Sequence, residues 1–287
     1  MSRMSGRAAA IARPSRFAVT ERVAVAVVVV FVLGRGFGAS AQSLPSAADL
    51  PDWSGAWARS TGAFYESTPE QALEPPPAAD SPRRKPPYTP KFDAIYRENL
   101  ARIAADRFPD PISLCGTPAG WPRMLALPDA YEFVIRPEQT WLLAENGPNL
   151  VRVYTDGRAH PAPEDMWATY TGNNVGRWEK DELVFHSIGL KGVGSTILAR
   201  TGLVMSDKLE TNTRIRLIAP DRLLVSLVLV DSEALTRPWP VAFTYTRLPP
   251  GSTVYDYACA ENNRNPVTSD GRTLTLDPSG QVIDKLE

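Results

Sequence analysis

The chain has 287 residues, of which 43% are hydrophobic and 22% are charged, and its formal net charge is −1. This balance excludes a disordered, collagen-like, coiled-coil or disulfide-rich chain, and the length allows a hydrophobic core in one domain or at most two. The near-zero charge argues against a dedicated nucleic-acid-binding protein. Because the chain has only two histidines, it cannot form a His-rich metal site.

Residues 1–41 have the pattern of a secretory signal peptide. Arginines at positions 3, 7, 13 and 16 precede the apolar run Val23–Leu33, and Ala39–Ala41 supplies the small residues of a cleavage site. A transmembrane anchor is the alternative, but it needs about 20 apolar residues, and this run has eleven. The sequence therefore predicts a bacterial protein that is periplasmic or secreted, with no stable membrane anchor after cleavage.

Cleavage after Ala41 would change the net charge of the chain. Residues 1–41 contain six arginines and one acid, so the mature chain has 31 − 6 = 25 basic and 32 − 1 = 31 acidic residues, a net charge of −6. An acidic chain is poorly suited to nucleic acid or to an anionic membrane surface, because both are negatively charged. We therefore expect neither of them as a partner, and the sequence leaves the oligomeric state open.

The first part of the mature chain is rich in proline. Ten of the 46 residues from Pro45 to Pro90 are proline, so residues 42–90 are expected to form an arm with little regular structure. Apolar residues at three- and four-residue spacing then predict one helix over Lys91–Arg107. A second loop, punctuated by proline and glycine, follows at 109–128.

From Tyr131 onward the sequence is typical of consecutive β-strands. Asn146-Gly147 indicates a hairpin turn, and polar and apolar residues alternate in several segments. Leu209, Thr211, Thr213, Ile215 and Leu217 share one face of a strand, and Trp239, Val241, Phe243 and Tyr245 share another. The expected strands are Tyr131–Arg136, Gln139–Glu145, Asn149–Thr155, Val175–Lys180, Glu182–Ile188, Ile197–Val204, Lys208–Ile218, Asp221–Asp231 and Trp239–Leu248.

Eight or nine strands with short turns predict a mainly β protein, folded as an antiparallel barrel or as a sandwich. A barrel of eight or more strands can enclose a ligand cavity. The expected organisation is a signal peptide at 1–41, the Pro-rich arm at 42–90, a helix plus β-barrel domain at 91–260, and a polar C-terminal tail at 261–287.

Cys115 and Cys259 are the only cysteines, and both lie in the mature chain. In an oxidising compartment, two cysteines predict one disulfide bond. The alternative is two free thiols, one of them a nucleophile, but neither cysteine has an adjacent histidine to support that reading.

Two patterns resemble known proteins. Gly55-Ala56-Trp57 resembles the Gly-x-Trp element near the start of the first strand in lipocalin-like barrels, which implies a lipocalin-like topology. A wider set of motifs resembles a large group of uncharacterised exported bacterial proteins, and this resemblance implies an exported barrel-like domain without naming a reaction. Members of the group commonly carry Gly-Asp-Thr at 180–182 and Asp at 186, where this chain differs. The motifs span Cys115–Arg123, Val153–Pro161, Val175–Val184, Leu235–Trp239 and Tyr257–Asn263.

The most chemically varied motif surrounds one turn and contains Tyr154, Asp156, Arg158 and His160. The His160 imidazole is suited to general acid–base catalysis with Asp156 orienting it, while Arg158 or Tyr154 stabilises developing charge. These four residues are the catalytic candidates. In the alternative interpretation Asp156-Gly157 is an ordinary turn, and Arg158 pairs with Asp156 or Glu179.

Ligand-binding candidates are Arg177, Trp178, Glu179 and His186. Alternation places Arg177 and Glu179 on one face of a strand and Trp178 on the other. The polar face either lines a cavity or forms a salt bridge on the outer surface. No ligand spacing predicts a metal site, and no nucleotide, phosphate or redox motif predicts a cofactor.

The sequence thus favours an exported protein that binds or transforms a hydrophobic small molecule, aromatic or terpenoid-like, in a barrel cavity. One alternative is a cofactor-independent isomerase, cyclase or lyase that uses His160 and Asp156. Another is a non-catalytic surface interaction domain, which would have no cavity.

Overall fold

The computed structural model describes residues 44–105, 107, 109, 118–147, 149–191 and 202–258, with the isolated positions 266, 268–269, 274, 279 and 281–282. Ten of the strands are β1 (Trp57–Gly62), β2 (Tyr131–Ile135), β3 (Gln139–Ala144), β4 (Asn146–Gly147), β5 (Leu150–Tyr154), β6 (Asn173–Glu179), β7 (Glu182–Ile188), β8 (Leu209–Ala219), β9 (Arg222–Asp231) and β10 (Trp239–Arg247). The remaining elements are the strand β11 (Tyr257–Ala258), the helix α1 (Pro90–Ala104) and the 3-10 turns η1 (Ala47–Asp49), η2 (Gln71–Leu73), η3 (Pro82–Arg84), η5 (Arg123–Ala126) and η6 (Pro163–Asp165).

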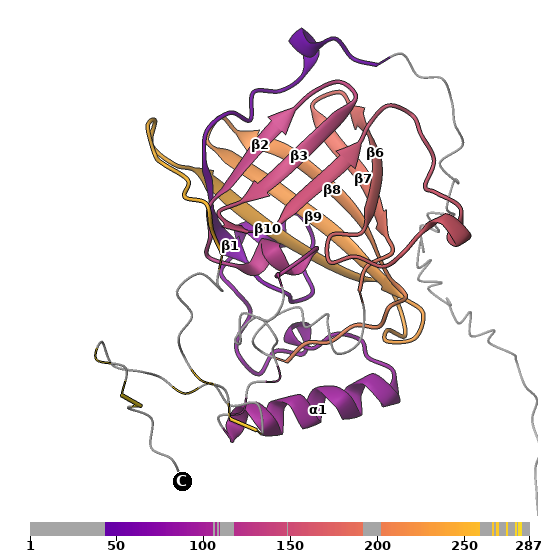
Figure 1. The fold of residues 1–287 in the computed structure, drawn as a ribbon, viewed down its shortest axis with the longest axis vertical. Coiled ribbons are helices and arrows are strands. Elements are labelled where there is room, and N and C mark those ends of the chain that lie inside the picture. Colours follow the sequence, from indigo (N-terminus) through magenta and orange to yellow (C-terminus); the bar gives the residue numbers. More distant parts are fainter. Residues whose placement is uncertain are drawn as a thin grey trace, which may run out of the picture. The chain divides into compact units, whose positions relative to one another are not determined.

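Nine strands close into a barrel in the order β1-β10-β9-β8-β7-β6-β5-β3-β2, with β2 returning to β1 (Figure 1). The predicted mainly β barrel is confirmed. The expectation of a purely antiparallel barrel needs one correction, because β5 and β6 pair in parallel through Val153–Asn174 and Tyr154–Val175. An odd number of strands cannot alternate direction all the way round a closed ring, so at least one parallel pair is required.

The 42–90 segment contains more regular structure than its prolines suggest. It supplies β1, which pairs with β10 along its length and closes the barrel against β2 at Trp57–Tyr131. No proline interrupts Trp57–Gly62, so its backbone groups can join the ladder. The strand begins at Trp57, where the Gly-x-Trp resemblance places the start of a first strand. The Arg247 guanidinium covers the Trp57 ring at 4.5 Å.

The predicted helix is also present, as α1. Pro90 occupies its first turn, a position where the missing N–H costs nothing, and Phe92 is fully buried on its inner side. The Asn99 side chain donates to the Gly202 carbonyl at 2.9 Å, which ties the helix to the chain ahead of β8. Figure 1 shows α1 outside the barrel, near one of its ends.

The predicted hairpin at Asn146-Gly147 is present, because these two residues lie in the connection between the antiparallel strands β3 and β5. They also form the short strand β4, which pairs in parallel with β11. Most of the strand expected at Ile197–Val204 falls outside the described residues, as does most of the tail at 261–287.

The interior of the barrel is lined by the alternating faces predicted from the sequence. Leu209, Thr211, Thr213 and Ile215 are fully or almost fully buried on β8, and so are Trp239, Val241, Phe243 and Tyr245 on β10. Burial of these faces removes apolar surface from water and is the main stabilising contribution to the barrel.

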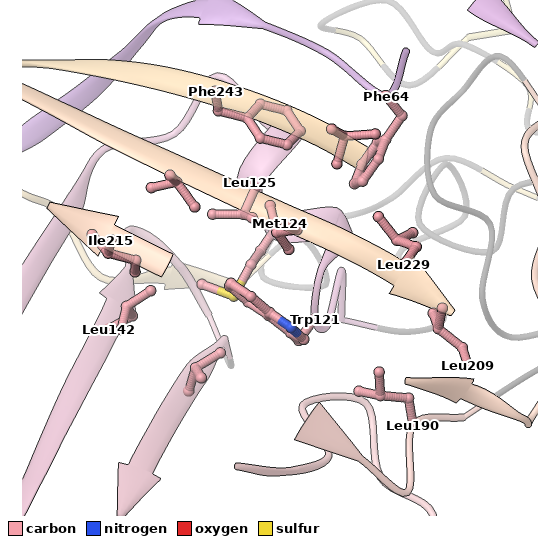
Figure 2. Packing of buried hydrophobic residues seen from close by; sticks show 14 of the residues in the cluster. Phe64, Trp121, Met124, Leu125, Leu142, Leu190, Leu209, Ile215, Leu229 and Phe243 are labelled. Carbon is pink, nitrogen blue, oxygen red and sulfur yellow. The ribbon is translucent and has the colours of Figure 1, made fainter. Parts of the chain in front are cut away.

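The chain also fills part of its own barrel with residues 119–127, which we call the plug. Its side chains Trp121, Met124 and Leu125 lie among residues of several strands (Figure 2). Tyr131 of β2 donates to the Met124 carbonyl, and Tyr245 of β10 donates to the Leu125 carbonyl at 2.8 Å. Burial raises the pKa of both phenols, so each remains a hydrogen-bond donor at neutral pH.

Gly120 allows the chain to enter the barrel at this point. Its φ of +70° is in the left-handed region, and a Cβ there would collide with the Tyr170 carbonyl. Two hydrogen bonds fix the entry: the Gly120 N–H donates to Asn149 Oδ1 at 2.8 Å, and the Trp121 N–H donates to the Tyr170 carbonyl at 2.7 Å.

Candidate functional site

Five polar side chains form a band on the inner wall of the barrel, which we call the polar arc: Thr140, Asn174, Ser187, Thr211 and Thr213. They come from four strands, β3, β6, β7 and β8. Asn174, Ser187 and Thr211 are consecutive partners across β6, β7 and β8, and Val153 lies between Thr140 and Asn174. The register therefore places these polar groups side by side in an otherwise apolar interior.

Four atoms of the polar arc have no hydrogen-bond partner in the structure: Thr140 Oγ1, Asn174 Oδ1, Ser187 Oγ and Thr213 Oγ1. Their side chains are no more than 2% exposed, so bulk water does not reach them. Buried polar groups in folded proteins are nearly always hydrogen-bonded. These four atoms therefore leave unused hydrogen-bond donors and acceptors on the inner wall of the barrel.

The fifth member of the arc is satisfied by the plug. Trp121 donates from Nε1 to Thr211 Oγ1 at 2.9 Å, and its ring lies 5.4 Å from the ring of Phe185. An aromatic wall thus adjoins the polar arc. This pairing of ring surface with a few fixed polar groups is common in small-molecule sites.

The four catalytic candidates lie outside the barrel interior and divide into two groups. Asp156 and Arg158 form a paired salt bridge, with the Arg158 Nε 2.9 Å and Nη2 2.6 Å from the carboxylate oxygens, and the guanidinium lies 3.9 Å from the centre of the Tyr154 ring. Hydrogen bonds from the Arg158 side chain lower the pKa of Asp156. The Asp156 carboxylate is engaged by Arg158, and no hydrogen bond in the described structure joins it to His160.

His160 instead contacts the second histidine of the chain. Its Nε2 lies 3.2 Å from His186 Nδ1, and its Nδ1 lies 2.6 Å from Asn173 Oδ1. The His186 Nε2 in turn lies 3.2 Å from Glu210 Oε2. This His160–His186–Glu210 chain runs across β7 and β8 on the outer face, because His186 pairs with Val175 and Asn212 and alternates with the inward Phe185 and Ser187.

Burial and the neighbouring His186 lower the pKa of His160, against an opposing hydrogen bond to Asn173. The unfolded chain therefore binds a proton at a higher pH than the folded chain does. As the pH falls below about 6.5, the ordinary pKa of histidine, folding stability should fall. We expect His160→Gln to show a smaller loss of melting temperature between pH 7.5 and pH 5 than the wild type; an identical loss in both would contradict the assignment.

The ligand-binding candidates Arg177 and Glu179 lie on the outer face of the barrel. Glu179 forms ion pairs with Arg177 and with Arg214 of β8, the latter at 2.6 Å, and Arg214 also pairs with Glu182. These side chains are partly exposed, so each single ion pair contributes at most about 1 kcal/mol to stability. Trp178 points the opposite way and packs against Trp53, with the ring centres 5.2 Å apart. The structure thus separates Trp178 from its two charged neighbours.

Two further results concern metals and membranes. Over the described ranges, no group of three or more His, Cys, Asp or Glu side chains is arranged to hold a metal ion. In the same part of the chain, no helix is long and apolar enough to cross a membrane.

The predicted partners Cys115 and Cys259 lie outside the described residues, so their disulfide stays a prediction.

Comparison with known proteins gives no assignment for this site. No protein-family model matches the chain, and no curated protein sequence matches it.

Sequence reasoning did not single out the polar arc as a site. The signal that was available is the alternation in β8, which puts Thr211 and Thr213 on the same face as Leu209 and Ile215. Polar residues on an apolar face are informative because burying them unpaired is costly. The plug had no such signal, since its proline and glycine indicated only a loop.

Proposed function

We propose that this protein binds a small hydrophobic molecule inside its barrel, with the polar arc fixing the orientation of the ligand. The observation that supports this most is the set of four unpartnered atoms on Thr140, Asn174, Ser187 and Thr213. Leaving one such group buried without a partner costs about 1–3 kcal/mol. The total stability of a domain is about 5–15 kcal/mol, so four such groups would cost a large share of it. A bound ligand that forms hydrogen bonds with them would remove this cost.

The chemistry of the arc limits the class of ligand. It contains hydroxyls, which can donate and accept, and an amide oxygen, which accepts, but no charged side chain. A neutral ligand with hydroxyl or carbonyl groups would satisfy it. The rings of Trp121 and Phe185 suit a flat or cyclic apolar body, so an aromatic or terpenoid-like molecule fits both parts of the site.

Native mass spectrometry of the purified protein tests this proposal. The expected result is a co-purified small molecule that is lost from the double variant Thr140→Val with Ser187→Ala. The matched control is Ser226→Ala, because Ser226 lies on β9 and alternates with the inward Val225 and Leu227. Ordered water can also complete a polar site. An empty wild-type protein that binds no neutral ring compound from a screen would overturn the proposal.

A second candidate is a cofactor-independent isomerase, cyclase or lyase, and the His160–His186–Glu210 chain favours it. A histidine oriented by a second histidine and a carboxylate can carry a proton in either direction. Turnover of a candidate substrate by the purified protein would be compared with turnover by His160→Ala and Glu210→Gln, which remove the first and last members of this chain. Unchanged turnover in both variants would remove this assignment. If neither a bound ligand nor turnover is found, the remaining candidate function is that of a non-catalytic surface interaction domain.

Export to the periplasm or the medium is part of the same proposal, and it rests on the signal-peptide pattern of residues 1–41. Because export would place the chain in an oxidising compartment, we also propose that Cys115 and Cys259 form a disulfide bond. The intact mass of exported protein before and after reduction tests both. We expect an N-terminus at Gln42 and a mass increase of about two hydrogens on reduction; two free thiols in exported protein would contradict the disulfide.

A further inference from the structure

The two histidines of the chain face each other on the outer wall of the barrel. His186 lies on β7, and His160 lies on the connection between β5 and β6. The His160 Nε2 and the His186 Nδ1 are 3.2 Å apart, and the ring centres are 5.1 Å apart with the ring planes at 80°. We propose that these two nitrogens bind one divalent transition-metal ion, such as Zn²⁺.

The outer partners of the two rings leave a lone pair on each of the facing nitrogens. His160 Nδ1 lies 2.6 Å from Asn173 Oδ1, and His186 Nε2 lies 3.2 Å from Glu210 Oε2. An amide oxygen and a carboxylate oxygen only accept hydrogen bonds, so these two ring nitrogens are the donors. A neutral imidazole carries a single N–H, and its other nitrogen is then an acceptor. Two acceptors therefore face each other, which is unfavourable until a cation lies between them.

The spacing of the two rings matches that of two ligands on one ion. Zinc–nitrogen bonds are about 2.0–2.1 Å long, so a tetrahedral ion holds two ring nitrogens about 3.3 Å apart and the ring centres about 5.2 Å apart. A straight hydrogen bond between the same nitrogens would separate the ring centres by about 5.5 Å. The observed 5.1 Å is closer to the metal arrangement, so the pair needs little movement to accept an ion.

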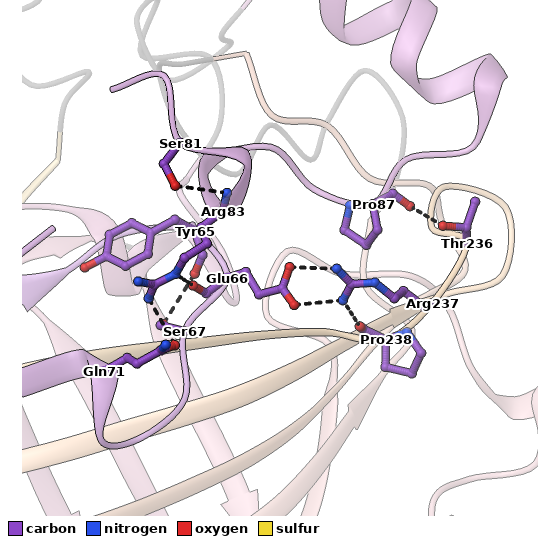
Figure 3. Close-up of polar contacts among 10 residues, drawn as sticks. All are labelled: Tyr65, Glu66, Ser67, Gln71, Ser81, Arg83, Pro87, Thr236, Arg237 and Pro238. Carbon is purple, nitrogen blue, oxygen red and sulfur yellow. Dashed lines mark hydrogen bonds and ion pairs between the residues drawn. The ribbon is translucent and has the colours of Figure 1, made fainter. Parts of the chain in front are cut away.

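Glu210 supplies negative charge beside the pair. Elsewhere on the surface, arginine side chains hold carboxylates, as Arg237 holds Glu66 at 2.9 and 2.7 Å (Figure 3). The Glu210 carboxylate instead pairs with His186. Histidines that bind metal usually donate their other N–H to a carboxylate or another oxygen, which orients the ring and increases its basicity. Glu210 and Asn173 hold His186 and His160 in this way.

Water would complete the coordination of the ion. Over the part of the chain that the structure describes, no third His, Cys, Asp or Glu joins the pair to hold a metal. The His186 side chain is 19% exposed, so solvent reaches it. The ion would use the His160 lone pair that acid–base catalysis requires, so this site and that second candidate function exclude each other.

One metal-free arrangement competes with the site. If the Asn173 amide turned over, its Nδ2 would donate to His160, and His160 would donate to His186. This chain of hydrogen bonds would be complete without an ion. A zinc titration separates the two arrangements, because only the first has two lone pairs for the metal.

Isothermal titration calorimetry with zinc chloride tests the proposal on the exported chain without an affinity tag. Iodoacetamide treatment blocks any free thiol of Cys115 or Cys259, which would otherwise compete for zinc. We expect one zinc ion per chain. His160→Ala and His186→Ala should each abolish saturable binding, because each removes one of two protein ligands. No binding by the wild type, or wild-type affinity in either variant, would overturn the proposal.

Glu210→Gln should weaken zinc binding by about tenfold or more, the usual effect of losing the outer partner of a metal-binding histidine. Glu66→Gln is the matched control, because it removes the same charge from a carboxylate that Arg237 holds. Its substitution should leave zinc binding unchanged. Equal affinities of the two variants would overturn the proposed orientation of His186 by Glu210.

A further measurement on the wild type keeps the test informative if a variant does not fold. Because the chain has only two histidines, long-range ¹H–¹⁵N spectra contain the signals of only two imidazoles. Zinc should shift the His160 Nε2 and His186 Nδ1 signals, and zinc that binds without shifting them would overturn the proposal. Thr213→Val, which alters the polar arc, should leave zinc binding intact, so failure of the barrel ligand and failure of this site can be told apart.

Discussion

Replacing Trp121 with alanine should lower the free energy of unfolding by about 3–5 kcal/mol, the usual cost of truncating a buried tryptophan. Trp121 is 2% exposed and packs in the middle of the barrel core. The substitution would leave a large cavity and would remove the hydrogen-bond donor to Thr211. Urea unfolding followed by circular dichroism measures the change.

Trp167→Ala is the control for this experiment. Trp167 is 78% exposed on the connection between β5 and β6, so its loss should change stability by no more than about 0.5 kcal/mol. Similar losses for Trp121→Ala and Trp167→Ala would show that the plug does not pack inside the barrel as described.

Asp231→Ala should cost about 3–5 kcal/mol, because it removes an acceptor on which several buried donors depend. The Asp231 carboxylate, 2% exposed, accepts from the Ser206 N–H and hydroxyl, both at 2.7 Å, and from the N–H groups of Glu233 and Ala234, at 3.0 and 2.9 Å. These bonds fix the end of β9 and tie it to the segment that enters β8.

Thermal or urea unfolding of Asp231→Ala should be compared with Glu233→Ala. The Glu233 side chain is 46% exposed and its nearest cation, Lys91, is 3.8 Å away, so we expect a change within about 0.5 kcal/mol. A loss below about 1 kcal/mol in Asp231→Ala would mean that its donors find other partners.

Local patterns predicted most of the barrel wall. Strands β8 and β10 followed from strict alternation, and α1 followed from apolar spacing between two prolines, because both signals lie within a single element. Strand β1 was obscured by the prolines on either side of it. The plug could not be foreseen, since a loop enters a barrel only through contacts with distant strands, such as those of Tyr131 and Tyr245.

The candidate site was less predictable than the fold, because its parts are far apart in the sequence. His160 and His186 are separated by 26 positions and meet only because the connection after β5 returns to the face of β7. The motif around Asp156 combines several chemical groups, but its two charged side chains, Asp156 and Arg158, pair with each other.

The most direct measurement is the unfolding free energy of ligand-free Thr213→Val and Thr211→Val. Both threonines are fully buried on the inner face of β8, and only the Thr211 hydroxyl has a protein partner. Removing the unpaired Thr213 hydroxyl should leave stability unchanged or raise it by about 1 kcal/mol, whereas Thr211→Val should lower it by about 1–3 kcal/mol. Equal losses in the two variants would show that the polar arc is already satisfied by the protein, and would contradict a ligand site in the barrel.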